Sequence, residues 1–306
     1  MATNTKTNDI IPVIDLKDFP NQSSKLIAAC EEWGCFRLLN FNDVLPEPLM
    51  LEMKAVVRSL FDLPGEIKSR NIDEFAEDGY LAPSPQNMLY ESFGIQDITS
   101  RRGVEYFCSQ LDATPQQRET IRRYAEAVHG LVKEIGTKIA ESLGVKSENF
   151  KFENWTCKSR INKYHFTPQS LGSFGGPVHT DSGFLTILHD DEGVGGLEVM
   201  NGSGEFVPAD PWPGTLLLNL GDMATVWSNG RFRNVKHRVL CKEGNTRHSI
   251  ASFVVGLDET LEPLPDLVDH DHHSKFQPIN SVGYRKLRYL KNMHAGEALA
   301  LLQPNK

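Results

Sequence analysis

A series of short apolar runs, separated by turn residues, follows Trp155 and limits the fold more than any other feature of the chain. The runs are rich in β-branched residues, which favour strands, and they read SRINKYHF, FLTILHD, GGLEVM, EFVPAD, TLLLNLGDM, HRVLCK and SIASFVVGL. Several short strands at close spacing are typical of a barrel or a double-sheet jelly roll, whereas a sheet of β-α-β units would alternate strands with helices. The sequence therefore predicts a mainly β core over about 156–256.

The residues before this core are predicted to be mainly helical, with short strands at IPVIDL and CFRLL. The clearest helix spans residues 115–143, because Thr114 is a good N-cap, Pro115 suits the first turn and Gly144 ends the pattern. Apolar residues recur along it at helical spacing, at Ile121, Tyr124, Val128, Leu131, Val132, Ile135, Ile139 and Leu143. We also predict helices at SSKLIAACEEWG, at PEPLMLEMKAVVRSLFDLP and, near the C-terminus, at SVGYRKLRYLKNMHAGEALALL.

We expect these elements to form one structural unit with two regions. Residues 10–115 form an N-terminal region of helices and short strands, and residues 116–306 hold the long helix, the β core and a C-terminal helical segment. Residues 64–112 show no clear periodicity and are predicted to be irregular. Long irregular segments often shape a binding site, so part of this stretch is expected to line one.

Charge and composition exclude several classes of protein. The net charge of −8 at pH 7 argues against a surface for nucleic acid or anionic membranes. No apolar run approaches the about 20 residues of a membrane span, and the first residues, MATNTKTNDIIPVIDL, lack a basic-then-apolar secretory signal. The five cysteines are an odd number without zinc-like spacing, which suits reduced thiols. We therefore expect a cytoplasmic protein whose partners are small molecules.

The segment PVHTDSGFLTILHDDEG carries a candidate metal site. On a strand, His179 and Asp181 would project to one side and Thr180 to the other. Such a pair is either half of a metal site or a single surface hydrogen bond. His237, on the later run HRVLCK, supplies a third ligand. Two histidines and one carboxylate form the facial triad of non-haem Fe(II), which leaves positions for a co-substrate and O₂, whereas zinc sites more often use other ligand sets.

Two further motifs place polar side chains on single strand faces. Arg247 and Ser249 share a face in RHSIASF, and Arg160, Asn162 and Tyr164 share one in RINKYHF. A buried arginine is costly unless an anion meets it. A guanidinium with a hydroxyl suits the distal carboxylate of a dicarboxylate, to which the Tyr164 hydroxyl can add a hydrogen bond. The alternative is that Arg247 pairs with an internal Asp or Glu.

These motifs together resemble those of the plant 2-oxoglutarate- and Fe(II)-dependent dioxygenases. The likeness covers nearly the whole chain, since IPVIDL and EEWGCFRL resemble the family's N-terminal region and LLLNLGDMATVWSNG its core. Within the family, NKYHF, HTDSGFLTIL, GGLEVM and WSNGRFRNVKHRV are most similar to the dioxygenases for auxin oxidation, which convert indole-3-acetate to its 2-oxo derivative. One departure is NFNDVLP, which stands where the family usually has Asn-His-Gly.

The resemblance implies an α+β protein with a mainly β core, a double-stranded β-helix (jelly roll) flanked by N-terminal and C-terminal helices. It implies that Fe(II) is bound by His179, Asp181 and His237. It also implies that 2-oxoglutarate is bound by Arg247, Ser249 and Tyr164, with Asn162 beside it. The expected reaction incorporates oxygen from O₂ and releases succinate and CO₂, and ascorbate is expected to support activity.

The substrate is the least constrained part of the prediction. Tyr80, Phe93, Trp155 and Phe232 are candidates to line a slot for a flat ring, with ordinary core packing as the alternative, and Arg160 is a candidate partner for a substrate carboxylate. The first candidate reaction is indole-3-acetate to 2-oxoindole-3-acetate. Three alternatives are a hydroxylase or demethylase of an alkaloid or phenolic, an iron oxidase that does not use 2-oxoglutarate, and a non-catalytic module that binds a small acid.

A second histidine cluster stands in DHDHHSKF. Its members, His270, His272 and His273, read either as a further metal site or as an exposed polar loop. Three histidines in a run of polar residues are more typical of a loop, so we predict the loop.

Overall fold

Two β-sheets lie face to face at the centre of the computed structural model, which describes residues 10–73, 78–85, 87–145, 155–256, 260–268 and 273–304. The larger sheet contains, in spatial order, β1 (Val13–Asp15), β2 (Cys35–Leu39), β9 (Leu216–Leu220), β6 (Leu185–His189), β11 (Arg247–Val255), β4 (Thr156–Tyr164) and β3 (Tyr90–Ile95). The smaller contains β5 (Phe174–His179), β10 (His237–Leu240), β7 (Leu197–Met200) and β8 (Phe206–Pro208). Only the β1–β2 pair is parallel within these two sheets. The predicted double-sheet jelly roll is confirmed.

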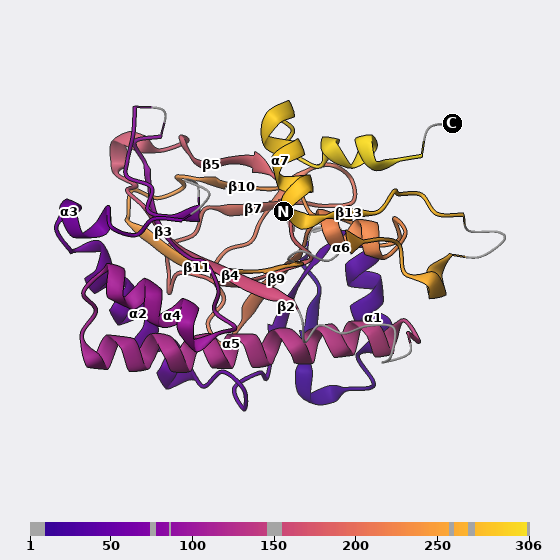
Figure 1. The fold of residues 1–306 in the computed structure, drawn as a ribbon, viewed down its shortest axis with the longest axis horizontal. Coiled ribbons are helices and arrows are strands. Elements are labelled where there is room, and N and C mark those ends of the chain that lie inside the picture. The colour runs from indigo at the N-terminus through magenta and orange to yellow at the C-terminus, as the bar shows by residue number, and fades with distance from the viewer. Residues whose placement is uncertain are drawn as a thin grey trace, which may run out of the picture.

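Helices cover the face of the larger sheet that points away from the smaller one (Figure 1). These are α1 (Ser23–Ala28), which continues as a π-helical turn over Ala29–Trp33, α2 (Glu47–Phe61), α4 (Arg101–Gln110) and α5 (Pro115–Ser142). The short helices α3 (Gly65–Lys68) and α6 (Asp222–Trp227) and the C-terminal α7 (Ser281–Lys291) complete the described helices, with 3₁₀ turns at Leu16–Asp18, Pro168–Ser170, Pro265–Leu267 and Glu297–Leu302. A two-stranded ribbon of β12 (Thr260–Leu261) and β13 (Ile279–Asn280) precedes α7.

The long helix α5 forms as its termini predict. The Thr114 hydroxyl accepts a hydrogen bond from the Gln117 backbone N–H (3.3 Å), and the Gln117 side chain accepts one from the Thr114 N–H (2.8 Å). Gly144, past the other end, has a φ of +72°, a left-handed conformation that glycine adopts without strain. The apolar stripe of α5 is buried against α1, α2 and α4, so this helix joins the N-terminal helices to the large sheet.

The prediction that residues 64–112 are irregular is wrong, because this stretch contains α3, β3 and α4. The strand β3 has a carboxylate, Glu91, at a buried position, which hides the apolar alternation of a strand. That carboxylate accepts hydrogen bonds from Lys68 Nζ (2.6 Å) and the Tyr80 hydroxyl (2.6 Å), and it lies 3.0 Å from His165 Nε2. These partners come from three separate segments, so a pattern read along the chain does not detect them.

One large cluster of buried apolar side chains draws on both predicted regions of the chain. Phe36 and Phe107, from residues 10–115, are buried in it together with Val128 and Leu218, from residues 116–306. A second, smaller cluster lies around the interior of the jelly roll and includes Tyr164 and Val239. Side chains from both regions therefore pack in one buried cluster. Among the helices of the described residues, none combines the length and the hydropathy needed to cross a bilayer.

Candidate active site

Three potential metal ligands converge on the inner face of the smaller sheet. His179 ends β5 and His237 begins β10, and the two residues pair directly across the ladder. Oδ1 of Asp181 lies 3.9 Å from Nε2 of His179 and 3.7 Å from Nε2 of His237. The ligand atoms of the three side chains all lie within 4.8 Å of one another. This convergence is the arrangement expected of a facial triad.

Asp181 does not lie on a strand, contrary to the prediction that it shares a strand face with His179. β5 ends at His179, and residues 180–184 connect it to β6. The backbone of Thr180 donates to the carbonyl of His294 (2.9 Å), and the carbonyl of Asp181 accepts from the backbone of Asp222 (2.8 Å). These partners replace the hydrogen bonds of a strand, and the connection still places the Asp181 carboxylate beside both imidazoles.

Hydrogen bonds orient each of the three side chains. Nδ1 of His179 donates to the Pro177 carbonyl (2.8 Å) and Nδ1 of His237 to the Val235 carbonyl (3.2 Å), which leaves both Nε2 lone pairs free. The Thr186 hydroxyl donates to Oδ2 of Asp181 (2.6 Å), which leaves Oδ1 free. Backbone carbonyls and hydroxyls in these roles are typical of metal sites, so the donor set fits a divalent metal such as Fe(II).

The protonation state of His179 also suits a metal. Burial and the neighbouring His237 together lower the pKa of His179 to about 4, against the opposing effect of Asp181. The imidazole is therefore neutral near pH 7, as a metal ligand must be. Binding a metal near neutral pH displaces no proton from this ring.

The polar residues predicted to bind iron, 2-oxoglutarate or a substrate carboxylate all line one cavity between the two sheets. This inner cavity has a volume of about 450 Å³, which is within the range for small-molecule sites. Besides the three converging side chains, it is lined by Arg160, Asn162, Tyr164, Arg247 and Ser249. They lie together because β4 and β11 are neighbours, with Tyr164 opposite Arg247 and Asn162 opposite Ser249. The predicted strand faces are therefore confirmed.

A chain of hydrogen bonds prepares Ser249 to donate into this cavity. The Tyr90 hydroxyl donates to Oδ1 of Asn162 (2.7 Å), whose Nδ2 donates to Oγ of Ser249 (3.2 Å). Nη1 of Arg247 lies 3.5 Å from the same Oγ. A serine hydroxyl has two acceptor lone pairs and one proton. Because both neighbours donate to the oxygen, the proton is left for an anionic ligand.

Arg247 both pairs with an internal acid and lines the cavity. The sequence left open whether it meets an internal carboxylate or a bound anion, and its position is compatible with both. Its guanidinium is 1% exposed and binds the carboxylate of Asp190, which does not line the inner cavity. Within the described residues, Nε of Arg247 is a buried donor without a hydrogen-bond partner. Buried donors are normally paired, so an unpaired nitrogen on a guanidinium that lines the cavity fits the carboxylate of a bound dicarboxylate such as 2-oxoglutarate.

The structure places none of the four aromatic residues proposed as a substrate slot at the cavity. Phe93 and Phe232 are fully buried in the large core, and the Trp155 ring packs edge-on against Phe184. Tyr80 packs on Phe93 and donates to Glu91. An aromatic ring serves a core as well as a pocket, and the sheet face that each occupies cannot be read from composition.

Other rings, from Tyr90, Tyr164 and Phe253, line the cavity instead. Phe253 was detectable in the sequence, since it continues the face of β11 that carries Ser249 and Ala251. Tyr90 was not, because it begins the strand hidden by Glu91. Residues 80–93 do contribute to the site as expected, through Asn87 and Tyr90.

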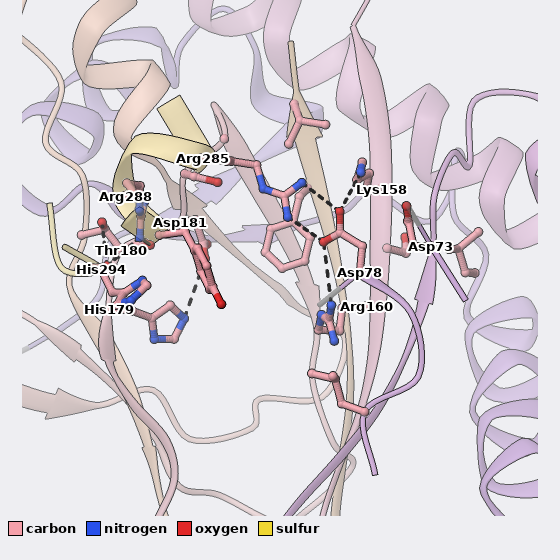
Figure 2. Close-up of a pocket in the computed structure, with 18 of the residues that line it drawn as sticks. Asp73, Asp78, Lys158, Arg160, His179, Thr180, Asp181, Arg285, Arg288 and His294 are labelled. Carbon is pink, nitrogen blue, oxygen red and sulfur yellow. Dashed lines mark hydrogen bonds and ion pairs between the residues drawn. The ribbon is translucent and has the colours of Figure 1, made fainter. Parts of the chain in front are cut away.

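A second cavity of about 500 Å³ adjoins the first (Figure 2). Arg160 lines both cavities, and its Nη1 donates to Ser92 Oγ (2.7 Å). In the outer cavity the carboxylate of Asp78 accepts two hydrogen bonds from Arg285 of α7 (2.7 and 2.8 Å) and one from Lys158 (2.9 Å), and Arg160 Nη2 lies 3.9 Å from it. Arg160 thus occupies the junction of the two cavities.

The structure gives no support to a second metal site among the described residues. Their only group of three or more candidate metal ligands is the one formed by His179, Asp181 and His237. His270 and His272 lie outside the described residues. His273 lies within them, and its backbone carbonyl accepts a hydrogen bond from Asn229 Nδ2 (3.1 Å).

Comparison with known proteins identifies the family of this chain. Residues 155–255 match the 2OG-Fe(II) oxygenase superfamily, and residues 11–119 match the family described as non-haem dioxygenase in morphine synthesis N-terminal. The chain therefore belongs to the 2OG-Fe(II) oxygenase superfamily and is a 2-oxoglutarate-dependent dioxygenase. Its co-substrate is 2-oxoglutarate and its metal is Fe(II).

Within that superfamily the chain is similar to proteins named for auxin oxidation. It is 45% identical to the 2-oxoglutarate-dependent dioxygenase DAO of Oryza sativa over 95% of this chain and 98% of that protein. The crystal structure of dioxygenase for auxin oxidation in rice has a TM-score of 0.88 over 96% of this chain and all of that one. Dioxygenase for auxin oxidation 1 from Arabidopsis thaliana, solved as a binary complex with 2-oxoglutarate, has 50% identity and a TM-score of 0.82, covering 86% of this chain and 100% of that one.

Proposed function

We propose that the chain oxidises indole-3-acetate to 2-oxoindole-3-acetate, with Fe(II) bound by His179, Asp181 and His237. The observation that carries this proposal is the convergence of these three side chains on one wall of a cavity whose other wall holds Arg247 and Ser249. When bound, the iron and 2-oxoglutarate together activate O₂, with release of succinate and CO₂ and transfer of one oxygen atom to the substrate.

The chain's own residues are proposed to hold and orient the reactants. Arg247 and Ser249 bind the distal carboxylate of 2-oxoglutarate by a charge-assisted pair and one added hydrogen bond, and Asn162 directs the Ser249 proton toward it. Asp190 fixes the far edge of the Arg247 guanidinium. Tyr164 lies against the same guanidinium, whose central carbon is 5.1 Å from the ring centroid, and so limits access of water.

The substrate proposal rests on similarity and on the lining of the cavity. The relatives that share 44–50% identity with this chain are named for auxin oxidation. A flat aromatic acid needs an apolar slot with a cation at one end. Tyr90 and Phe253 offer ring faces, and Arg160, between the two cavities, offers the cation.

The proposal is tested by incubating the purified protein with Fe(II), 2-oxoglutarate, ascorbate and indole-3-acetate under air. We expect 2-oxoindole-3-acetate and succinate in equal amounts by mass spectrometry. Succinate formed only with another planar metabolite, such as an alkaloid or phenolic acid, would transfer the assignment to that substrate. Substrate oxidation without consumption of 2-oxoglutarate would contradict the proposed chemistry.

We also propose a cytoplasmic location. All five cysteines are buried and free of disulfides, which is typical of proteins in a reducing compartment.

Replacement of the proposed 2-oxoglutarate residues is expected to weaken co-substrate binding in a graded way. Ser249→Ala removes one hydrogen bond and should weaken the apparent affinity by about 1 kcal/mol, roughly fivefold. Arg247→Lys keeps the charge but loses the planar fork, and should weaken it by about tenfold or more. The measurement is the 2-oxoglutarate concentration dependence of succinate release. An unchanged dependence in Arg247→Lys would show that the guanidinium pairs with Asp190 alone.

A further inference from the structure

Asp181 lies in the connection between β5 and β6, residues 180–184. Two elements distant in sequence, α6 and α7, hold this connection from two sides. We propose that Arg288 of α7 is a positioning residue for Asp181, and that α7 is thereby a working part of the iron site. The inference rests on the proposed iron ligands and extends them to a residue that contacts neither imidazole.

On the first side, the start of α6 holds the connection through its backbone. The N–H of Asp222 donates to the Asp181 carbonyl (2.8 Å), and the N–H of Met223 donates to the Gly183 carbonyl (3.0 Å). A Cβ atom at Gly221 would lie 2.2 Å from the Gly183 oxygen and 2.7 Å from the Asp181 oxygen. Only glycine permits this approach, so the start of α6 packs directly against the backbone of the connection.

On the second side, Arg288 of α7 and His294, which follows α7, hold the same connection. Nη2 of Arg288 donates to the carbonyls of Thr180 (2.8 Å) and His294 (2.6 Å), and the Thr180 N–H donates to the His294 carbonyl (2.9 Å). Figure 2 shows Arg288 beside Thr180 and Asp181, at the edge of the cavity. The residue next to the proposed ligand is thus fixed by a guanidinium that is 7% exposed.

The two sides are joined by the Arg288 guanidinium itself. Its Nη1 donates to Oδ2 of Asp222 (2.5 Å), whose carboxylate is fully buried. The Tyr284 hydroxyl donates to the same oxygen (2.8 Å), and Asn234 Nδ2 donates to Oδ1 (2.6 Å). The planar guanidinium of Arg288 therefore links α6, α7 and the connection. Its orientation is fixed because both Nη1 and Nη2 are hydrogen-bonded.

This arrangement matters because a metal site tolerates little displacement of a ligand. The side chain of Asp181 is held at Oδ2 by Thr186, so the position of Oδ1 depends on the backbone of residues 180–183. Ligand sets need placement to within about 0.5 Å, and loss of supporting contacts typically costs 10–100-fold in metal affinity. Arg288 is expected to act on metal affinity more than on the fold.

The test compares Arg288→Lys with Tyr284→Phe, a matched control that removes a different hydrogen bond to the same Asp222 oxygen. Fe(II) alone is titrated anaerobically into the metal-free protein by calorimetry, and thermal unfolding of each metal-free variant is recorded. Lysine keeps the charge beside Asp222 but replaces the two-nitrogen fork by one nitrogen. We expect the Fe(II) affinity to fall roughly tenfold or more in Arg288→Lys and to stay within about twofold of the original in Tyr284→Phe, although both variants unfold at lower temperature.

Two results would overturn the inference: an Fe(II) affinity in Arg288→Lys within about twofold of the original, or an equal loss in Tyr284→Phe. If Arg288→Lys does not fold, the double variant Asp222→Asn with Arg288→Gln removes both buried charges together and is expected to show the same loss. His237→Ala serves as the reference. Equal Fe(II) binding by the original and His237→Ala would mean that the proposed ligands, and not Arg288, are wrong.

Discussion

Replacing His237 with alanine is expected to abolish both succinate release and substrate oxidation while the protein remains folded. Loss of a contact that merely supports a metal ligand costs about 10–100-fold, so loss of a ligand itself should exceed that range. The fold should persist because the imidazole faces the cavity, and among the described residues its side chain hydrogen-bonds only to the Val235 carbonyl. The measurements are succinate release, bound Fe(II) per chain and the circular dichroism spectrum.

A matched control lies one residue further along the same strand. Arg238 points to the opposite face of β10, where it pairs with Glu198 (2.7 Å) and stacks over Phe206. Arg238→Gln should therefore keep Fe(II) binding and turnover close to their original values. Retention of most activity by His237→Ala, with iron still bound, would remove the basis of the proposed site.

The parts of this protein that could be predicted from sequence depend on local periodicity. Strands expose alternate residues to one face, so the pattern in β4 and β11 places Arg160, Asn162 and Tyr164 on one face and Arg247 with Ser249 on another. The structure brings the two faces together because β4 and β11 pair in the register that opposes Ser249 to Asn162. The caps of α5 are equally local, and its two ends lie where Thr114 and Gly144 predict.

The parts that could not be predicted depend on which distant elements meet. No local pattern reveals that Asp190 lies behind Arg247, or that Arg288 reaches the connection after β5. Asp181 illustrates the same limit, since its position was expected but the strand that was to carry it ends two residues earlier. Phe93, one of the four aromatic residues proposed to line the substrate slot, misses the cavity for a related reason, because Phe93 and Asn162, on adjacent strands, project to opposite faces of the large sheet.

Recognition of the substrate carboxylate is expected to depend on Arg160. If its guanidinium binds the carboxylate of indole-3-acetate, Arg160→Leu should lower kcat/KM for this acid by about 10–100-fold, the value of a charge-assisted hydrogen bond of roughly 1.5–3 kcal/mol. Indole-3-acetamide, which has the same ring but no charge, should lose only a few-fold, about 1 kcal/mol or less. The measurement is kcat/KM for both compounds in the original protein and the variant, with succinate release as the common readout.

Lys158 provides the control that separates recognition from support of the loop around Asp78. It lies on the same strand as Arg160 and donates to Asp78 (2.9 Å), but it lines only the outer cavity. Lys158→Met removes a hydrogen bond to the Asp78 carboxylate but leaves the Arg160 guanidinium in place. It should therefore lower kcat/KM only weakly, and equally for indole-3-acetate and indole-3-acetamide. Equal losses for the two compounds in Arg160→Leu would mean that Arg160 acts through Ser92 and Asp78 on the shape of the wall. A selective loss for the acid would instead make the guanidinium the group that distinguishes a carboxylate substrate from a neutral one.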